Sequence, residues 1–240
     1  MSRIGPTNFP ATQWSVVLSA GGDACDASRA ALETLCRTYW APLFSYLRQE
    51  GHPPDAAQDL VQGFLARLLE RHDFATVAPE RGRFRSFLLA GLRHYLVSEI
   101  RREDTQKRGG RAITVPINGV EPDLGNEPRL TDSLTPETAF DRHWAQTVIE
   151  RALERLRHEH EQRGKLGWYE VLKPTLAGEP ESSYAGLGTS LGLSEGAVAV
   201  AVHRLRQRLR ELVRTEVAQT VGTAGDLEEE MRHLMAVWTN

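Results

Sequence analysis

Hydrophobic residues recur at steps of three and four along most of this chain, which is the period of amphipathic α-helices. The pattern predicts a first helix over residues 28–49, in which Pro42 marks either a kink or a helix boundary. Residues 51–54 are helix breakers, and Asp55 then stands where an N-cap belongs. A second helix is therefore predicted from Asp55 to about Arg71.

A third helix is predicted from Phe84 to about Arg102, after a turn at residues 78–82. Its predicted inward-facing residues are Phe87, Leu88, Leu92, Leu96 and Ile100. Amphipathic helices of this kind bury their apolar faces against one another. The sequence therefore predicts a compact helical domain over residues 28–108, preceded by an N-terminal extension of residues 1–27.

Residues 109–136 are rich in proline, glycine and acidic side chains, and they predict an extended linker. Helix is predicted to resume near Thr135-Pro136-Glu137 and to continue to Gly164. The apolar face of this helix consists of Phe140, Trp144, Val148, Ala152 and Leu156. A second domain is predicted over residues 137–215.

The end of this second domain has the pattern of a helix-turn-helix motif. A short helix over residues 184–191 is followed by Gly192-Leu193-Ser194 and then by a longer helix. Gly192 suits the positive φ of the turn, Leu193 fills the space between the helices, and Ser194 caps the second helix. The inward-facing residues of that helix are predicted to be Val198, Val202, Leu205, Leu209 and Leu212. DNA-binding versions of the motif place the second helix in the major groove.

The last segment, residues 216–240, predicts one more amphipathic helix. Met231, Leu234, Met235 and Trp238 follow the helical period. The acidic run of residues 226–230 is interpreted as the solvated start of this helix.

The positive charge of the chain is concentrated in two places. The chain has 240 residues, of which 40% are hydrophobic and 25% charged, as in soluble globular proteins, and its formal net charge is -3. Residues 81–111 contain nine basic and three acidic residues, a net charge of +6, and residues 201–214 reach +4. Basic residues gathered in this way indicate contact with nucleic acid.

Several classes of protein are disfavoured by the sequence. No apolar run approaches the ~20 residues needed to span a bilayer, and the first residues lack the order of a secretory signal, so we expect no membrane span and a cytoplasmic location. Cys25 and Cys36 are too few for a metal pair or a disulfide framework, and the eight histidines lack zinc-ligand spacing. We expect no metal and no cofactor. Motifs of nucleotide-binding, serine-hydrolase and zinc-protease sites are absent from the sequence, so we do not expect an enzyme.

Three segments in this order resemble the extracytoplasmic-function sigma factors of bacterial RNA polymerase: residues 55–65, residues 84–102 and residues 184–212. With the spacing between them, they cover most of the chain. The resemblance implies an all-α fold of two domains, a sigma region-two-like helical bundle and a C-terminal helix-turn-helix domain, joined by an extended linker. It further implies a factor that binds core RNA polymerase, directs it to specific promoters and assists DNA melting.

The resemblance assigns contacts with core polymerase to Asp59, Gln62 and Phe64. The alternative is that Asp59 and Gln62 lie on the solvated side of an amphipathic helix while Phe64 belongs to the core. Recognition and opening of the minus-ten element are assigned to Arg83, Arg85, Arg93, His94, Tyr95, Arg101 and Arg102. Strand opening needs cations for phosphates and surfaces for unstacked bases. Here the alternative is a set of core aromatic residues beside a solvated face of arginines.

Contacts of the helix-turn-helix with the minus-thirty-five element are assigned to Ser194, Glu195, His203, Arg204 and Gln207. The chain departs from the family at Gly196 and residues 199–201, which are small or apolar where members commonly have Lys, Ser or Arg. Recognition could then rest on methyl contacts, DNA shape or phosphate positioning. Alternatively, residues 197–202 are apolar because they pack against the C-terminal helix, which would mask them.

The partners implied by the resemblance are bacterial core RNA polymerase and promoter DNA. As in other members, an anti-sigma factor or a regulatory kinase is a further expected partner. The C-terminal tail is interpreted first as a plain packing helix, and self-regulation by the tail is the alternative. Two other functions stay open. One is a helix-turn-helix regulator that binds duplex DNA without polymerase, and the other is a sigma-derived interaction adaptor that does not support initiation.

Overall fold

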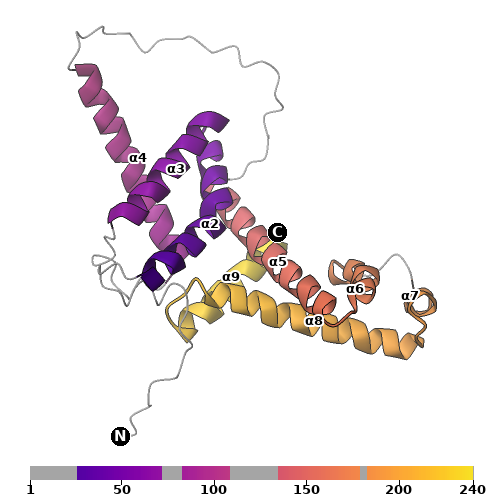
Figure 1. Ribbon diagram of the computed structural model, residues 1–240. Helices are drawn as coiled ribbons and strands as arrows, with labels where there is room; N and C mark the ends of the chain where they lie inside the picture. Colours follow the sequence, from indigo (N-terminus) through magenta and orange to yellow (C-terminus); the bar gives the residue numbers. More distant parts are fainter. Residues whose placement is uncertain (1–25, 72–82, 109–134, 179–182, 240) are drawn as a thin grey trace, which may run out of the picture.

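The computed structural model describes residues 26–71, 83–108, 135–178 and 183–239. Within these residues the chain is helical, and an isolated bridge between Arg83 and Val221 is the one β pairing (Figure 1). The elements are α2 (Asp26–Gln49), α3 (Pro54–Arg71), α4 (Phe84–Arg108), α5 (Pro136–Gln162), α6 (Leu166–Leu172), the 3-10 turn η3 (Lys173–Leu176), α7 (Tyr184–Leu191), α8 (Glu195–Ala218) and α9 (Ala224–Thr239). The prediction of an all-α fold is confirmed for the described residues.

The helices predicted for the first half are present, with differences at their ends. Pro42 lies inside α2 and does not end it. The predicted N-cap at Asp55 is wrong. Helix α3 already begins at Pro54, and the Ala57 N–H bonds to the carbonyl of Pro53 at 2.9 Å. Asp55 instead lies in the first turn, where the positive end of the helix dipole stabilises its negative charge. Helix α4 continues beyond the predicted end at Arg102 to Arg108.

Helix α5 begins as the sequence predicts. The Thr135 hydroxyl accepts a hydrogen bond from the Thr138 N–H at 3.2 Å, and Pro136 occupies the first turn, where its missing N–H costs nothing. All five residues of the predicted apolar face are buried: Phe140, Trp144, Val148, Ala152 and Leu156. The short elements α6 and η3, which follow α5, were not predicted.

One continuous core connects both predicted domains. Helix α2 packs against α5, where Tyr39 stacks on Phe140 with ring centroids 6.1 Å apart. Tyr39 also meets the edge of Phe84 at 5.1 Å, so α2, α4 and α5 share this part of the core. The division into domains 28–108 and 137–215 remains a prediction. The predicted extension of residues 1–27 and linker of residues 109–136 lie almost wholly outside the described residues.

The predicted C-terminal amphipathic helix is present as α9. It packs against α5 and α8 and buries Leu227 and Leu234 (Figure 1). The acidic run in its first turns is not simply solvated, as the sequence suggested, because Glu230 is only 1% exposed.

One predicted core position is wrong. Ile100 is 61% exposed, whereas Leu88 and Leu92 of the same helix are fully buried. The second half of α4 projects beyond α2 and α3, so the apolar face of α4 has no neighbouring helix there (Figure 1). Periodicity identifies a face of a helix but not the length over which that face is covered.

Candidate nucleic-acid interface

Helices α7 and α8 meet in the geometry of a helix-turn-helix motif. They are bent by 94° across the turn of residues 192–194, within the ~90–120° typical of the motif. Gly192 has a φ of 66°, in the left-handed region that favours glycine. The Leu193 N–H bonds to the carbonyl of Gly188 at 2.9 Å, which closes the end of α7. The turn conformation predicted for Gly192 is confirmed.

Both helices of this motif have serine N-caps. The Ser183 hydroxyl accepts from the Gly186 N–H at 3.2 Å, and the Ser194 hydroxyl accepts from the Ala197 N–H at 3.3 Å. The predicted capping by Ser194 is confirmed. Because the Ser194 hydroxyl is used by the helix itself, this residue positions α8 in the structure.

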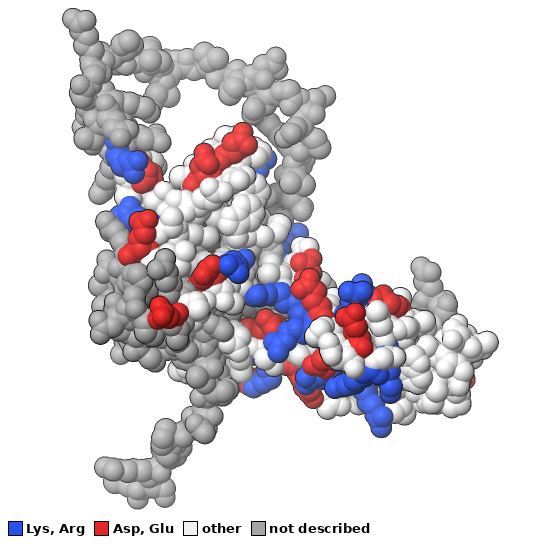
Figure 2. Space-filling model, in the orientation of Figure 1, with Lys and Arg blue, Asp and Glu red and all other residues white. Residues whose placement is uncertain are grey.

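Three of the other helix-turn-helix candidates, His203, Arg204 and Gln207, lie on one exposed face of α8. Glu195 begins the helix, and His203, Arg204 and Gln207 are exposed further along it. Between them, the side chain of Val200 is 50% exposed. In Figure 2 the end of the molecule formed by α7 and the start of α8 carries few charged side chains. The face is thus apolar in its first turns and polar afterwards.

The C-terminal helix does not cover these first turns. Helix α9 contacts α5 and the C-terminal half of α8, where Arg214 pairs with Glu228. The start of α8 lies at the other end of that helix, beside α7 (Figure 1). The alternative that residues 197–202 are apolar because they pack against the C-terminal helix is therefore wrong for this structure.

Most of the other arginines of α8 bind groups within the chain. Arg206 donates to the carbonyl oxygens of Thr175 and Gly178 at 2.7 and 3.0 Å. Arg208 binds Glu159 through two hydrogen bonds, of 2.6 and 3.0 Å. These bonds lower the pKa of Glu159 and raise that of Arg208. Arg204 and Arg210 are exposed and form no ion pair with any described residue, so they are the arginines of α8 that are open to a polyanion.

The three residues assigned to polymerase binding differ in their exposure to solvent. Asp59 and Gln62 are exposed on α3. Phe64 is 5% exposed, and its ring centroid lies 5.8 Å from that of Tyr95 on α4. Phe64 therefore holds α3 and α4 together, while Asp59 and Gln62 face solvent.

At the start of α4, Arg83 and Arg85 face carboxylates of α5 and α9. Arg85 binds Asp141 at 2.8 Å and holds both oxygens of Glu230, at 3.0 and 3.2 Å. Arg83 pairs with Glu229 and approaches Glu230 at 3.3 Å. The other oxygen of Asp141 lies 2.9 Å from the His233 Nε2. We call the set of Arg83, Arg85, Asp141, Glu229, Glu230 and His233 the α4–α9 ion cluster.

Within this cluster, Arg85, Asp141 and Glu230 are largely withdrawn from water. The Arg85 side chain is 12% exposed, and its guanidinium lies over the ring of Trp144 at 5.4 Å. Burial alone would lower the pKa of Arg85, but hydrogen bonding to Glu230 and the charges of Glu230 and Asp141 outweigh it and raise the pKa. A charge in such a site needs its partners, because an unpaired buried charge is strongly unfavourable.

The minus-ten candidates further along α4 have different surroundings. Arg93 pairs with Glu137 of α5 and donates to the Tyr46 hydroxyl at 3.2 Å. His94 is exposed. Tyr95 is half-buried against Phe64, with the Arg67 guanidinium 5.8 Å from its ring centroid.

Beyond these residues, Arg102 is exposed and makes a 3.4 Å contact with Glu99. Arg101 lies within α4, but its side chain is outside the part of the chain that the structure describes. The seven minus-ten candidates are thus not one free basic surface. Arg83 is held by α9 and Arg85 by both α9 and α5. Arg93 is exposed but paired with Glu137 of α5, and His94 and Arg102 are exposed.

Sequence reasoning did not single out Glu230, which lies at the centre of the α4–α9 ion cluster. Its signal is its position in the helical period. Glu230 is three residues after Leu227 and four before Leu234, so it occupies the buried face of α9. A carboxylate on an apolar face indicates a buried cation opposite it.

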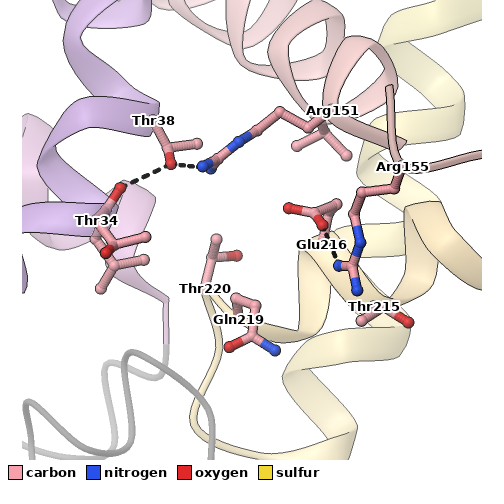
Figure 3. A pocket seen from close by; sticks show the side chains of 10 residues that line it. Thr34, Thr38, Arg151, Arg155, Thr215, Glu216, Gln219 and Thr220 are labelled. Atoms are coloured by element: carbon pink, nitrogen blue, oxygen red, sulfur yellow. Dashed lines mark hydrogen bonds and ion pairs between the residues drawn. The ribbon is translucent and has the colours of Figure 1, made fainter. Parts of the chain in front are cut away.

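A cavity of about 300 Å³ lies between α2, α5 and the C-terminal end of α8 (Figure 3). Threonine, arginine, glutamine and glutamate side chains form much of its lining. Arg151 donates to the Thr38 hydroxyl, and Arg155 pairs with Glu216, so both guanidinium groups have partners within the chain. The contact between α2 and the C-terminal half is therefore polar on this side and apolar around Tyr39.

Among residues 26–71, 83–108, 135–178 and 183–239, no three His, Cys, Asp or Glu side chains are placed to hold a metal ion. No single helix in this part of the chain is long and apolar enough to cross a membrane, and α7 and α8 reach that length and apolarity only together, across their 94° bend. Comparisons with protein-family models, curated proteins and solved structures give no match.

Proposed function

We propose that this chain is an initiation factor of the extracytoplasmic-function sigma type, which binds core bacterial RNA polymerase, directs it to promoters and helps to melt the minus-ten region. The observation that carries the proposal is the 94° turn between α7 and α8, preceded by α3 and α4 in the order of the resemblance. Such a factor acts in the cytoplasm and leaves all chemistry to the polymerase.

The exposed face of α8 supports a role in duplex binding. His203, Arg204 and Gln207 can donate hydrogen bonds to base edges or phosphates. The apolar Ala199 and Val200 can contact thymine methyl groups but read few hydrogen-bonding patterns. We therefore expect a modest sequence preference from this helix.

The second half of α4 supports a role in strand opening. Val97 and Ile100 are 48% and 61% exposed, and the Arg102 side chain is exposed nearby. Apolar side chains next to a cation suit an unstacked base and its phosphate. On α3, exposed Asp59 and Gln62 provide a polar surface for the polymerase, while buried Phe64 supports that surface from beneath.

The test is run-off transcription with purified core bacterial RNA polymerase, with and without this protein, on genomic fragments that include its own upstream region. New discrete start sites are the expected result. Absence of both core binding and new transcripts would overturn the proposal.

Two pairs of substitutions refine this test. Asp59→Ala with Gln62→Ala should weaken core binding, whereas Glu161→Ala with Gln162→Ala, an exposed pair on α5, should not.

Charge reversal at Arg101 and Arg102 should reduce promoter opening more than core binding, since these arginines are assigned to DNA. Reversal at the exposed Arg157 of α5 and at Arg163, which caps the C-terminal end of α5, is the control.

A second candidate, an interaction adaptor derived from a sigma factor, is favoured by the apolar, exposed first turns of α8. An adaptor binds core polymerase tightly but yields no transcripts. Duplex DNA binding without core binding would instead indicate a helix-turn-helix regulator, and a stable homodimer would support it because such regulators commonly dimerise.

A further inference from the structure

Two of the cations assigned to promoter DNA are already bound to anions of the same chain. Arg85 grips Glu230 with two hydrogen bonds and Asp141 with a third, and Arg83 pairs with Glu229 and Glu230. A guanidinium that holds a carboxylate in this two-pronged way uses the donors with which it would hold a phosphate. Carboxylates of α9 and phosphates of DNA therefore compete for these two arginines.

Backbone hydrogen bonds also hold the start of α4 against the segment before α9. The Phe84 N–H donates to the carbonyl of Thr220 at 3.0 Å, and Arg83 forms an isolated antiparallel bridge with Val221. Thr220 and Val221 are buried and lie just before α9. The start of α9 is thus held in register with the start of α4, which places Glu229 and Glu230 opposite the two arginines.

Apolar packing adds to these bonds. Leu227 and Leu234 of α9 are buried on either side of Glu230, and the His233 ring lies 5.9 Å from that of Trp144. Because Glu230 is itself buried, a nucleic acid cannot reach Arg85 along this face while α9 stays docked. Release of α9 would free Arg83 and would leave Arg85 with Asp141 of α5 as its carboxylate partner.

We propose that α9 is an autoinhibitory helix whose acidic residues occupy Arg83 and Arg85 in place of DNA phosphates. This inference rests on the proposed function in its assignment of these arginines to DNA. Binding of DNA at the start of α4 requires α9 to be displaced, so the docked state binds nucleic acid weakly.

The test compares the full-length wild-type chain with Glu229→Gln, Glu230→Gln and the double variant. The probe is a fluorescein-labelled dT 20-mer, and binding is followed by fluorescence anisotropy at several salt concentrations. Glu154→Gln is the matched control, because Glu154 is exposed on α5 and forms no ion pair with any described residue, so its loss frees no arginine. Hydrogen exchange of residues 224–239 reports whether α9 is released.

We expect the double variant to bind the probe about tenfold more tightly than the wild type. The slope of log affinity against log salt should steepen by about 1.4, since two more phosphate contacts each add about 0.7 on single strands. Glu154→Gln should change neither quantity. If Glu230→Gln unfolds the chain, Glu229→Gln still decides, because Glu229 is half-exposed and its removal uncovers no core residue.

Unchanged affinity would overturn the proposal, whether or not hydrogen exchange shows that α9 has been released. Binding of the wild type to core polymerase is measured separately. If the double variant gains DNA affinity but the chain does not bind polymerase, the autoinhibitory contact is supported and the sigma function is overturned. If the chain initiates transcription but the double variant gains no DNA affinity, the sigma function is supported and the autoinhibitory contact is overturned.

Discussion

Gly188 and Gly196 lie on the two helices of the helix-turn-helix and have opposite surroundings. A β-carbon added at Gly188 would lie 2.5 Å from the carbonyl oxygen of Leu193, whereas one added at Gly196 would meet nothing within 4 Å. Gly188→Ala should therefore reduce the free energy of unfolding by about 1–3 kcal/mol, the range for overpacking. Gly196→Ala should raise it by up to about 1 kcal/mol, because alanine favours helix.

Urea unfolding of the two variants measures this difference. Both substitutions add the same methyl group to a helix, so the difference between them isolates the close contact of Gly188 with the turn. Equal stability of the two variants would contradict the turn geometry described for residues 188–193.

Cys36 provides a prediction with a pH dependence. Burial, with a smaller contribution from the charge of Glu33, raises its pKa from 9.0 to about 12. In a Cys25→Ser variant, which leaves Cys36 as the only thiol, reaction with Ellman's reagent at pH 8 should be slower in the folded than in the unfolded chain by a factor on the order of 10³. Because the folded pKa is raised, the neutral thiol adds stability below pH 9 that is lost as the pH rises toward 12. Equal rates in buffer and in guanidinium would contradict the burial of Cys36.

Single residues were predictable where a regular pattern and a long neighbouring helix coincide. All five residues predicted for the apolar face of α5 are buried because α2 and α8 pack against this helix, although the buried Ala139 and Ala145 were not predicted. Ile100 was predicted wrongly because α4 extends past its neighbours, and Glu230 was missed because its partners lie 145 residues away in the sequence, at Arg85. Local patterns contain no information on such distant partners.

At the scale of helices, the sequence predicted the starts of α2, α3, α4, α5 and α8 within two residues, but it placed the end of α4 six residues too early. Capping residues explain this success at Thr135, Ser183 and Ser194, where a side-chain oxygen accepts from the first turn. Helix α6 was not predicted, because its seven residues are too few to show a period and Pro174 follows closely.

The contact between α4 and α9 leads to a stability prediction. Arg85→Ala would leave Glu230 and Asp141 without their main cation in a buried site, and should reduce the free energy of unfolding by about 3–5 kcal/mol. Arg102→Ala, which removes an exposed arginine from the same helix, should cost at most about 0.5 kcal/mol. Urea denaturation followed by circular dichroism measures both. A small loss for Arg85→Ala would mean that the α4–α9 ion cluster does not hold the helices together.

At the scale of the whole molecule, the sequence did not predict how the two halves meet. The apolar periods of α2 and α5 show that each has a buried face, but not that these faces bury one another across residues 50–135. Tyr39 touches both Phe84 and Phe140, so one side chain connects the predicted domains. The polar cavity beside this contact shows that the junction is only partly apolar.

Because the core is continuous, we expect the chain to unfold in a single cooperative transition. Differential scanning calorimetry should give a calorimetric enthalpy close to the van't Hoff enthalpy. A fragment of residues 1–134 should not fold stably, since it would expose Tyr39, Leu43 and Phe84 to water. Two separate transitions, or a stable fragment, would support independent domains.

Helix α8 joins the two ends of the molecule as one rigid rod. Its 24 residues span about 36 Å, with α9 against the C-terminal half and the 94° turn at the opposite end. Because the helix is this long, a tilt of about 10° at its C-terminal half would move its first turn by about 6 Å. This displacement exceeds the ~3.4 Å rise of one base pair. If α8 binds a duplex as proposed, such a tilt would move its first turn along the DNA by more than one base pair.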